Sequence, residues 1–237
     1  KKYCEFLHFK VWLVDGMYIR NQINIGFTNY DHHYHLRSIP KNEFWIDHHT
    51  NPKEIRFYID HLLVEHLLMS KGKSYSEAFT QANKIEKRER EKVKLLQTNI
   101  PKQPRETLVN KIHKKLIQQW SKGHLKVWVV KGNLVRQQYQ INFAEGGHDL
   151  VYHFIPKHEI WLDDDLTTKD HKFILLHELH ERNLMSRGWA YSDEDKKKSK
   201  IKRSAHKSAN AVEYYCRHHP EQLDSTLQKE LAKNENI

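Results

Sequence analysis

The chain is poor in the residues that build cross-linked or flexible proteins. Among its 237 residues there are two cysteines, eight glycines and six prolines. Two cysteines, Cys4 and Cys216, exclude a disulfide scaffold and suit a reducing compartment. Scarce glycine and proline exclude a fibrous or low-complexity chain. Because no apolar run approaches the roughly 20 residues of a membrane helix, we expect no membrane partner and a place in the cytoplasm or on an intracellular particle.

The chain is instead rich in charge, and that charge is unbalanced. It has 40 Lys and Arg residues against 30 Asp and Glu, a formal net charge of +10, while 38% of its residues are hydrophobic. The hydrophobic fraction is lean but sufficient for packed cores. A positive excess of this size favours partners that carry phosphate groups, RNA or DNA.

The strongest signal in the sequence is an internal duplication. Shifted by 116 residues, the two halves align without a gap from His8, which falls on His124, to Ser76, which falls on Ser192, and about two positions in five are identical. Such a match indicates two homologous modules. The predicted domains are module 1 at residues 1–97, a linker at 98–123, module 2 at 124–216 and a C-terminal helical tail at 217–237.

Each module begins with strand patterns and continues with helical ones. Val11–Val14 and its counterpart Val127–Val130 are rich in β-branched residues, and the glycine that follows predicts a hairpin with a second strand. Apolar residues then recur at helix spacing before Gly72 and Gly188, which suit the position just past a helix end. The predicted fold class is α+β, a tandem duplication of a small antiparallel sheet followed by two helices.

Capping signals and apolar spacing predict two further helices. Ser192 and the two acidic residues after it predict the N-cap of the second helix of module 2. Within residues 101–123 of the linker, apolar residues recur every fourth position and predict an amphipathic helix with Pro104 in its first turn. These apolar residues are Leu108, Ile112, Leu116 and Trp120.

The first helix of module 2 carries the clearest candidate for chemistry. It contains the run His177-Glu178-Leu179-His180-Glu181, in which residues three and four apart lie on one helix face. His177, with Glu181 or His180, can close on zinc or another divalent transition metal, since imidazole and carboxylate are zinc ligands. Glu178 then stands beside the first ligand as the general base for a bound water.

This helix resembles the signature helix of the zincins, the His-Glu-x-x-His metallopeptidases, in which the helix follows an edge strand. The strand pattern Glu159–Asp163 precedes it in the same way. The resemblance implies His177 as a ligand, Glu178 as the base and Glu181 as a ligand in place of the family's second histidine. It implies a peptidase-like, metal-dependent hydrolase.

Module 2 also resembles small uncharacterised proteins from phages and bacteria, whose helix pair reads approximately His-Glu-x-x-Glu…Leu-Met-x-x-Gly-x-x-Tyr-x-x-Ala-His. Counted without a gap, the Ala-His positions fall on Glu194 and Asp195, and the counterpart of Asp195 in module 1 is Phe79. Asp195 is then either a third metal ligand or the mark of a lost site. The matching residues are His177, Glu178, Glu181, Leu184, Met185, Gly188 and Tyr191.

Module 1 provides an internal comparison for this helix. His61 and Glu65 match His177 and Glu181, but Leu62 stands where module 2 has its candidate base. Without that base, we expect module 1 not to activate water. A His-x-x-x-Glu pair in both modules is also typical of a plain helix-stabilising contact, worth a few tenths of a kcal/mol, so this interpretation stays open.

Lysine and arginine gather in the predicted second helix of module 2. The run predicts a face that binds RNA or DNA, although a solvated lysine-rich surface has the same composition. In module 1 the corresponding charges alternate with glutamates and favour a solvated, ion-paired helix. The candidate nucleic-acid-binding residues are Lys196, Lys197, Lys198, Lys200, Lys202, Arg203 and Lys207.

Three classes of function follow from these patterns. The first is a metal-dependent, peptidase-like hydrolase that acts through module 2 alone. The second is a non-enzymatic basic protein that binds nucleic acid or a ribonucleoprotein. The third is a structural or assembly component, such as a phage or particle protein with a protein partner, in which the duplication doubles the contact surface.

Overall fold

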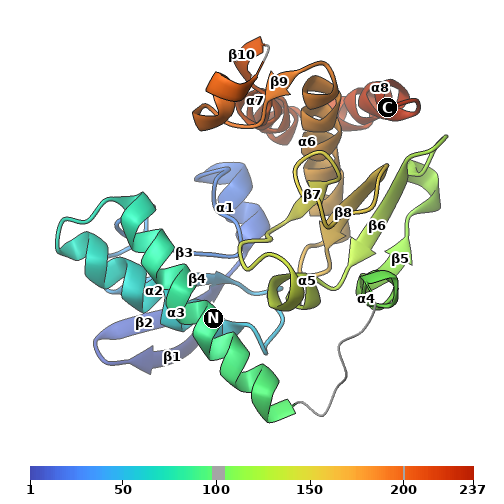
Figure 1. The fold of residues 1–237 in the computed structure, drawn as a ribbon. Helices are drawn as coiled ribbons and strands as arrows, with labels where there is room; N and C mark the ends of the chain where they lie inside the picture. The colour runs from blue at the N-terminus through green and yellow to red at the C-terminus, as the bar shows by residue number, and fades with distance from the viewer. Residues whose placement is uncertain (98–104, 200) are drawn as a thin grey trace. The chain divides into compact units, whose positions relative to one another are not determined.

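The computed structural model describes residues 1–97, 105–199 and 201–237, which form two compact units (Figure 1). Unit 1 comprises Lys1–Leu108 and Asn133–Asn142, and unit 2 comprises Val109–Gly132 and Phe143–Ile237. Each unit joins a four-stranded sheet to packed helices, which confirms the predicted α+β class.

Unit 1 contains the first sheet and a pair of long helices. Its elements are β1 (Lys2–Phe6), β2 (Phe9–Val14), α1 (Gly16–Gln22), β3 (Tyr30–His32), β4 (Glu43–Asp47), α2 (Ile55–Ser70) and α3 (Tyr75–Gln97). The strand order is β1-β2-β4-β3, and β2 runs parallel to β4 while the outer strands are antiparallel to their neighbours. The predicted antiparallel sheet is therefore wrong in its central pair, because the chain crosses over between β2 and β4 and makes the sheet mixed. α2 packs against α3, and its apolar residues join those of the sheet in one core.

Unit 2 repeats this sheet and adds helices. Its strand order, β5-β6-β8-β7, has the same pairing directions as the sheet of unit 1. α6 packs against both α7 and α8, and Leu223, Leu227 and Leu231 of α8 belong to the unit 2 core. The bounds are β5 (His113–Leu116), β6 (Lys126–Val130), β7 (Gly146–His148), β8 (Glu159–Asp163), α6 (Thr168–Ser186), β9 (Trp189–Ala190), β10 (Ile201–Ser204), α7 (Ala205–His218) and α8 (Leu223–Asn234).

The hairpin predicted after Val11–Val14 is wrong, because the chain forms the short helix α1 after this strand, β2. The Asp15 side chain accepts a hydrogen bond from the Tyr18 backbone N–H at 2.9 Å and caps this helix. A Cβ at Gly16 would collide with the Asp47 carboxylate at the end of β4. The glycine therefore serves a close approach rather than a hairpin turn. The second copy has the equivalent helix, α5 (Gly132–Gln138).

The predicted linker helix is wrong beyond Ile112. The helix α4 covers Arg105–Ile112, and the chain then forms β5, which pairs antiparallel with β6. β5 occupies the outer position that β1 has in the first sheet. Ile112 and Trp120 are buried as the apolar stripe predicts, but they reach the core from a helix end and a 3-10 turn. The predicted start of this helix, at residues 101–104, lies outside the described residues.

The predicted helix start at Ser192 is wrong, because α7 begins thirteen residues later. Ser204 is its N-cap, and its side chain accepts a hydrogen bond from the Lys207 backbone N–H at 3.1 Å. The offset between the copies rises from 116 residues at Ser76 to 127 at Ala78, which matches Ala205. Module 2 thus carries eleven extra residues, 193–203, here called the inserted segment. It contains a 3-10 turn, Glu194–Lys198, and most of β10.

Candidate metal site

Three side chains of unit 2 bring one ligand atom each to a common point. His177 Nε2 lies 3.2 Å from His206 Nδ1, and His206 Nδ1 lies 2.9 Å from Glu181 Oε2. The third side of the triangle, from His177 Nε2 to Glu181 Oε2, is 3.6 Å. Ligand atoms around a tetrahedral zinc ion stand about 3.4 Å apart. These three residues could therefore hold a metal ion.

The three residues come from two packed helices. His177 and Glu181 stand one turn apart on α6, and His206 belongs to the first turn of α7. The His206 backbone N–H donates to the Tyr191 carbonyl at 3.1 Å, which ties this turn to the segment after α6. The His177 side chain is 9% exposed and that of His206 42% exposed. The site is therefore enclosed at α6 and open to solvent beside His206.

A buried chain of ion pairs orients His177. Its Nδ1 lies 3.0 Å from Glu213 Oε2, and the other Glu213 oxygen accepts a hydrogen bond from Arg217 Nε at 2.8 Å. Arg217 also donates to Asp170 at 3.1 Å. Burial raises the pKa of Glu213, but the hydrogen bonds from His177 and Arg217 outweigh it and hold that pKa below its ordinary value. An ionised Glu213 fixes the His177 ring with Nε2 directed at the ligand position.

Glu181 is held by histidines on both oxygens. Its Oε1 lies 3.1 Å from Nε2 of His148, which ends the edge strand β7, while Oε2 faces His177 and His206. Burial raises the pKa of Glu181, yet the hydrogen bonds from the three histidines lower it overall. Glu181 is consequently a carboxylate, the form in which it binds a metal ion.

Glu178 lies beside this group with a different electrostatic environment. It is 8% exposed and stands with His148 and Glu181 in a second cluster of possible metal-binding residues. Burial and the negative charge of Glu181 raise the pKa of Glu178 above its ordinary value. Two neighbouring carboxyl groups with pKa values displaced in opposite directions are typical of acid–base sites.

Two predicted ligands, His180 and Asp195, lie outside the three-residue group. His180 faces another side of α6, where its ring nitrogens lie 3.1 Å from Glu230 and 3.0 Å from Ser208. Asp195 is in the inserted segment and accepts a hydrogen bond from Ser192 at 2.6 Å.

The third possible ligand of the group is His206, whose position the gapless alignment gives wrongly. The Ala-His pair of the phage and bacterial pattern is present as Ala205-His206, eleven residues beyond the expected positions. Phe79 is accordingly the counterpart of His206 rather than of Asp195. The Ala-His pair in the sequence could have identified His206. An alignment that keeps the offset of 116 residues beyond Ser192 does not align this pair with its counterpart, Ala78-Phe79. His148 and Glu213 were also missed, although both have identical counterparts in module 1.

Unit 1 retains the same arrangement without a third ligand. His61 Nε2 lies 3.0 Å from Glu65, and its Nδ1 lies 2.9 Å from Glu86. His32 contacts the other Glu65 oxygen at 3.0 Å. In place of a third ligand, the Phe79 ring packs edge-on against His61, with centroids 5.4 Å apart. Unit 1 therefore holds the scaffold of the site but not its full ligand set.

The helix that carries Glu86 is less solvated than its alternating charges predict. Glu86 and Arg90 are both buried, and Arg90 donates two hydrogen bonds of 2.9 Å to Glu54. These residues are the counterparts of Glu213, Arg217 and Asp170 in unit 2. Some of the alternating charges of this helix, Glu86 and Arg90, therefore belong to a buried network of ion pairs and not to the solvent-exposed face.

The residues of the predicted basic face do not lie on one helix. Lys207 is on α7, most of the other candidates are in the inserted segment, and Lys200 lies outside the described residues. Lys196 pairs with Asp193 at 2.6 Å, and Arg203 stacks on Trp189 at 5.4 Å. These contacts engage part of the positive charge locally. Binding of nucleic acid stays a prediction.

Two further groups of possible metal-binding residues, Asp47–His49 and Asp163–Asp165, follow β4 and β8. Each is a run of consecutive residues in which the first carboxylate accepts a backbone hydrogen bond from two residues on, at 3.1 Å from His49 and 3.0 Å from Asp165. Such contacts are typical of turns that begin with aspartate.

Comparison of the chain with protein-family models, curated proteins and solved structures gives no match. The resemblances to zincins and to phage and bacterial proteins stay predictions from short motifs. The strand before α6 differs from the zincin plan, since β8 lies between β6 and β7 inside the sheet and the edge strands are β5 and β7. Among the described helices, none is long and apolar enough to cross a lipid bilayer.

Proposed function

We propose that unit 2 is a metal-dependent hydrolase site in which His177, Glu181 and His206 hold one divalent transition-metal ion. The observation that carries this proposal is the triangle of ligand atoms, with sides of 2.9, 3.2 and 3.6 Å. Two imidazoles and one carboxylate are a ligand set that suits zinc and leaves a fourth position open for water or substrate. The partial exposure of His206 supplies access to that position.

The metal ion, Glu178 and Glu213 would have different roles in the reaction. A metal ion held there would acidify a bound water and polarise a carbonyl group of the substrate. Glu178 would be the group that accepts a proton from the attacking water and returns it to the leaving group, a role that its raised pKa and its position beside His177 favour. Glu213 keeps the His177 ring in place during these steps. The reaction class is hydrolysis of an amide or ester bond, and peptides are the proposed substrates.

The comparison of the two copies supports this assignment. Unit 1 conserves the histidine and carboxylate contacts that build the scaffold, yet it has Phe79 for the third ligand and Leu62 for the base. A pair that only stabilised the helix would need neither His206 nor Glu178. Unit 1 is then a non-catalytic copy that serves as scaffold or binding arm.

Metal analysis of the full chain tests the proposal. We expect about one zinc, iron or manganese ion per wild-type chain and none in His206→Phe, which installs the residue of unit 1. His218→Phe is the matched control, because it makes the same substitution at an exposed position of the same helix, and it should keep the ion. Equal metal content in both variants, or a wild-type chain without metal, would overturn the proposal.

A further inference from the structure

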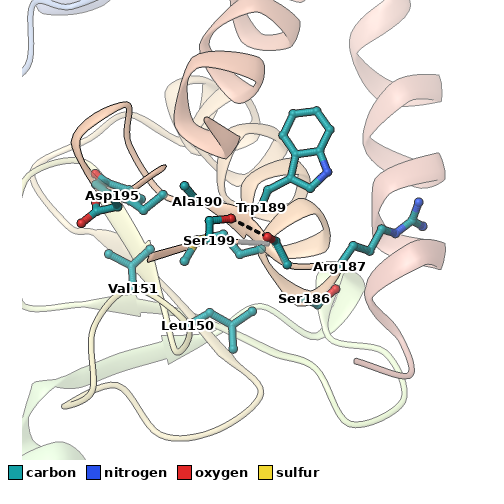
Figure 2. A pocket seen from close by; sticks show the side chains of 11 residues that line it. Leu150, Val151, Ser186, Arg187, Trp189, Ala190, Asp195 and Ser199 are labelled. Carbon is teal, nitrogen blue, oxygen red and sulfur yellow. Dashed lines mark hydrogen bonds between the residues drawn. The ribbon is translucent and has the colours of Figure 1, made fainter. Parts of the chain in front are cut away.

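A cavity of about 640 Å³ opens beside the three-residue group of unit 2 (Figure 2). Tyr191 connects the two, because it lines the cavity while its ring lies 5.3 Å from that of His206. Leu150 and Val151 form another part of the lining, and they follow His148, which contacts Glu181. The volume falls within the roughly 300–1,000 Å³ range of small-molecule sites.

The walls of the cavity combine apolar and polar surface in similar proportion. Leu150 and Val151 lie on one side, and Trp189 and Ala190 lie on the other, above the end of α6 (Figure 2). Met185 and Tyr191 add further apolar surface, while the charged side chains of Arg187 and Asp195 also line it. The apolar part of this lining can receive an apolar group, and the polar side chains in the same lining can orient the ligand.

The inserted segment completes the cavity. Ser199 Oγ donates a hydrogen bond of 2.6 Å to the Gly188 carbonyl, a contact drawn as a dashed line in Figure 2. The Ile201 backbone N–H donates to the same carbonyl at 3.3 Å, and β10 pairs with β9 in parallel. These contacts hold Ser199 and Ile201 against the end of α6, and Asp195 and Ser199 line the cavity from a segment for which module 1 has no residues.

In unit 1 the residues at the corresponding positions differ in size and contacts. The counterpart of Val151 is His35, whose ring stacks on Tyr75 with centroids 4.3 Å apart and an interplanar angle of 15°. Asp31 holds that ring through a contact of 2.8 Å to Nδ1. Tyr75 is the counterpart of Tyr191, so a histidine stacks on this tyrosine in unit 1, whereas in unit 2 Val151 and Tyr191 both line the cavity.

We propose that this cavity binds an apolar side chain of the substrate, such as leucine, phenylalanine or tryptophan, next to the bond that is hydrolysed. The inference rests on the proposed metal site. The inserted segment that contributes Asp195 and Ser199 to the cavity, the possible third ligand His206 and the possible base Glu178 occur together in module 2, and none of them has an equivalent in module 1. That coincidence assigns the cavity to the same substrate as the metal site.

Two hydroxamates test the inference on the zinc-loaded full chain. Acetohydroxamic acid carries only the metal-binding group, and 3-phenylpropionohydroxamic acid adds an apolar tail. Titration calorimetry should show about 30-fold tighter binding of the second compound, the gain expected from burying one large apolar group. Val151→His, which installs the unit 1 residue, and Trp189→Ala should reduce this ratio toward one. Both variants should keep the zinc and the affinity for acetohydroxamic acid.

The outcomes separate the two proposals. If neither compound binds the wild-type chain, the proposed metal site fails and this inference fails with it. If both bind with equal affinity, the metal site stands and the apolar cavity is refuted. A ratio that survives in both variants refutes it as well. His35→Val, the reverse change in unit 1, is the matched control and should leave both affinities at the wild-type value.

Discussion

His206 on α7 and Phe79 on α3 occupy the same place in the two copies. Each ring faces the histidine of the preceding helix edge-on, at centroid distances of 4.9 Å to His177 and 5.4 Å to His61. Unit 2 therefore has three possible metal ligands, and unit 1 lacks the third because phenylalanine replaces histidine. Four predictions follow from this relationship and from the contacts around it.

Phe79→His should create a second metal site. The variant places an imidazole beside His61 and Glu65, which already lie 3.0 Å apart in the ligand arrangement of unit 2. We expect the metal content of the chain to rise from about one to about two ions, measured by elemental analysis after dialysis. Thr80→His, one residue further on the same helix and exposed, is the control and should leave the content unchanged. An unchanged content in Phe79→His would show that the two clusters are not equivalent.

Glu178→Gln should abolish hydrolysis while the metal ion stays bound. The amide cannot accept a proton from water, and a general base contributes about 10²- to 10⁴-fold to rate. The loss should appear in kcat for a peptide substrate, with elemental analysis giving wild-type metal content. Glu181→Gln should lose metal and activity together. Full activity in Glu178→Gln would remove this residue from the mechanism.

Glu213→Gln should weaken metal binding without removing a ligand. Its carboxylate accepts the Nδ1–H hydrogen bond of His177 at 3.0 Å, and loss of such a partner costs about 10- to 100-fold in metal affinity. Competition with a fluorescent zinc chelator measures this change. Glu86→Gln makes the same substitution at the counterpart in unit 1 and should leave zinc affinity unaffected. Equal effects of the two variants would contradict the proposed positioning role.

The stability of unit 1 should depend on pH through His61 and Glu65. Burial raises the pKa of Glu65, but hydrogen bonds from His32 and His61 outweigh it and bring that pKa to about 2. Burial lowers the pKa of His61, but its hydrogen bonds to Glu65 and Glu86 raise it overall, above 6.5. The carboxylate's contribution is present above pH 4.5 and is lost as the pH falls toward about 2. The imidazolium's contribution is complete below pH 6.5 and is lost as the pH rises through the raised pKa.

Urea unfolding of the wild type and of His61→Gln at a series of pH values measures this dependence. The difference in free energy of unfolding should be largest between about pH 4.5 and 6.5 and should shrink on both sides. A difference that is constant from pH 3 to pH 9 would contradict the ion pairs described for unit 1.

Part of this arrangement could be predicted from the sequence. The duplication, the α+β class and the pairing of His177 with Glu181 follow from identity at a fixed offset and from the helical repeat. The helices α2 and α6 end before Gly72 and Gly188 as expected, both with positive φ. These features depend on contacts between residues close in the chain, which local patterns record.

Other parts depend on contacts between distant residues, and the sequence patterns mislead there. The run from Leu108 to Trp120 repeats every fourth residue, yet pairing with β6 makes its middle a strand. β7 is three residues long and begins with two glycines, so it has no strand signal, and its His148 reaches Glu181 only in the fold. His206 lies beyond the inserted segment, which no repeat in module 1 predicts.

The most direct measurement is anomalous X-ray diffraction from crystals of the zinc-loaded wild-type chain at the zinc absorption edge. We expect a strong anomalous peak in unit 2 with His177 Nε2, Glu181 Oε2 and His206 Nδ1 each about 2.0–2.2 Å away. We expect no such peak between His61 and Glu65. A zinc-loaded crystal without a peak among the three unit 2 residues would contradict the proposed metal site.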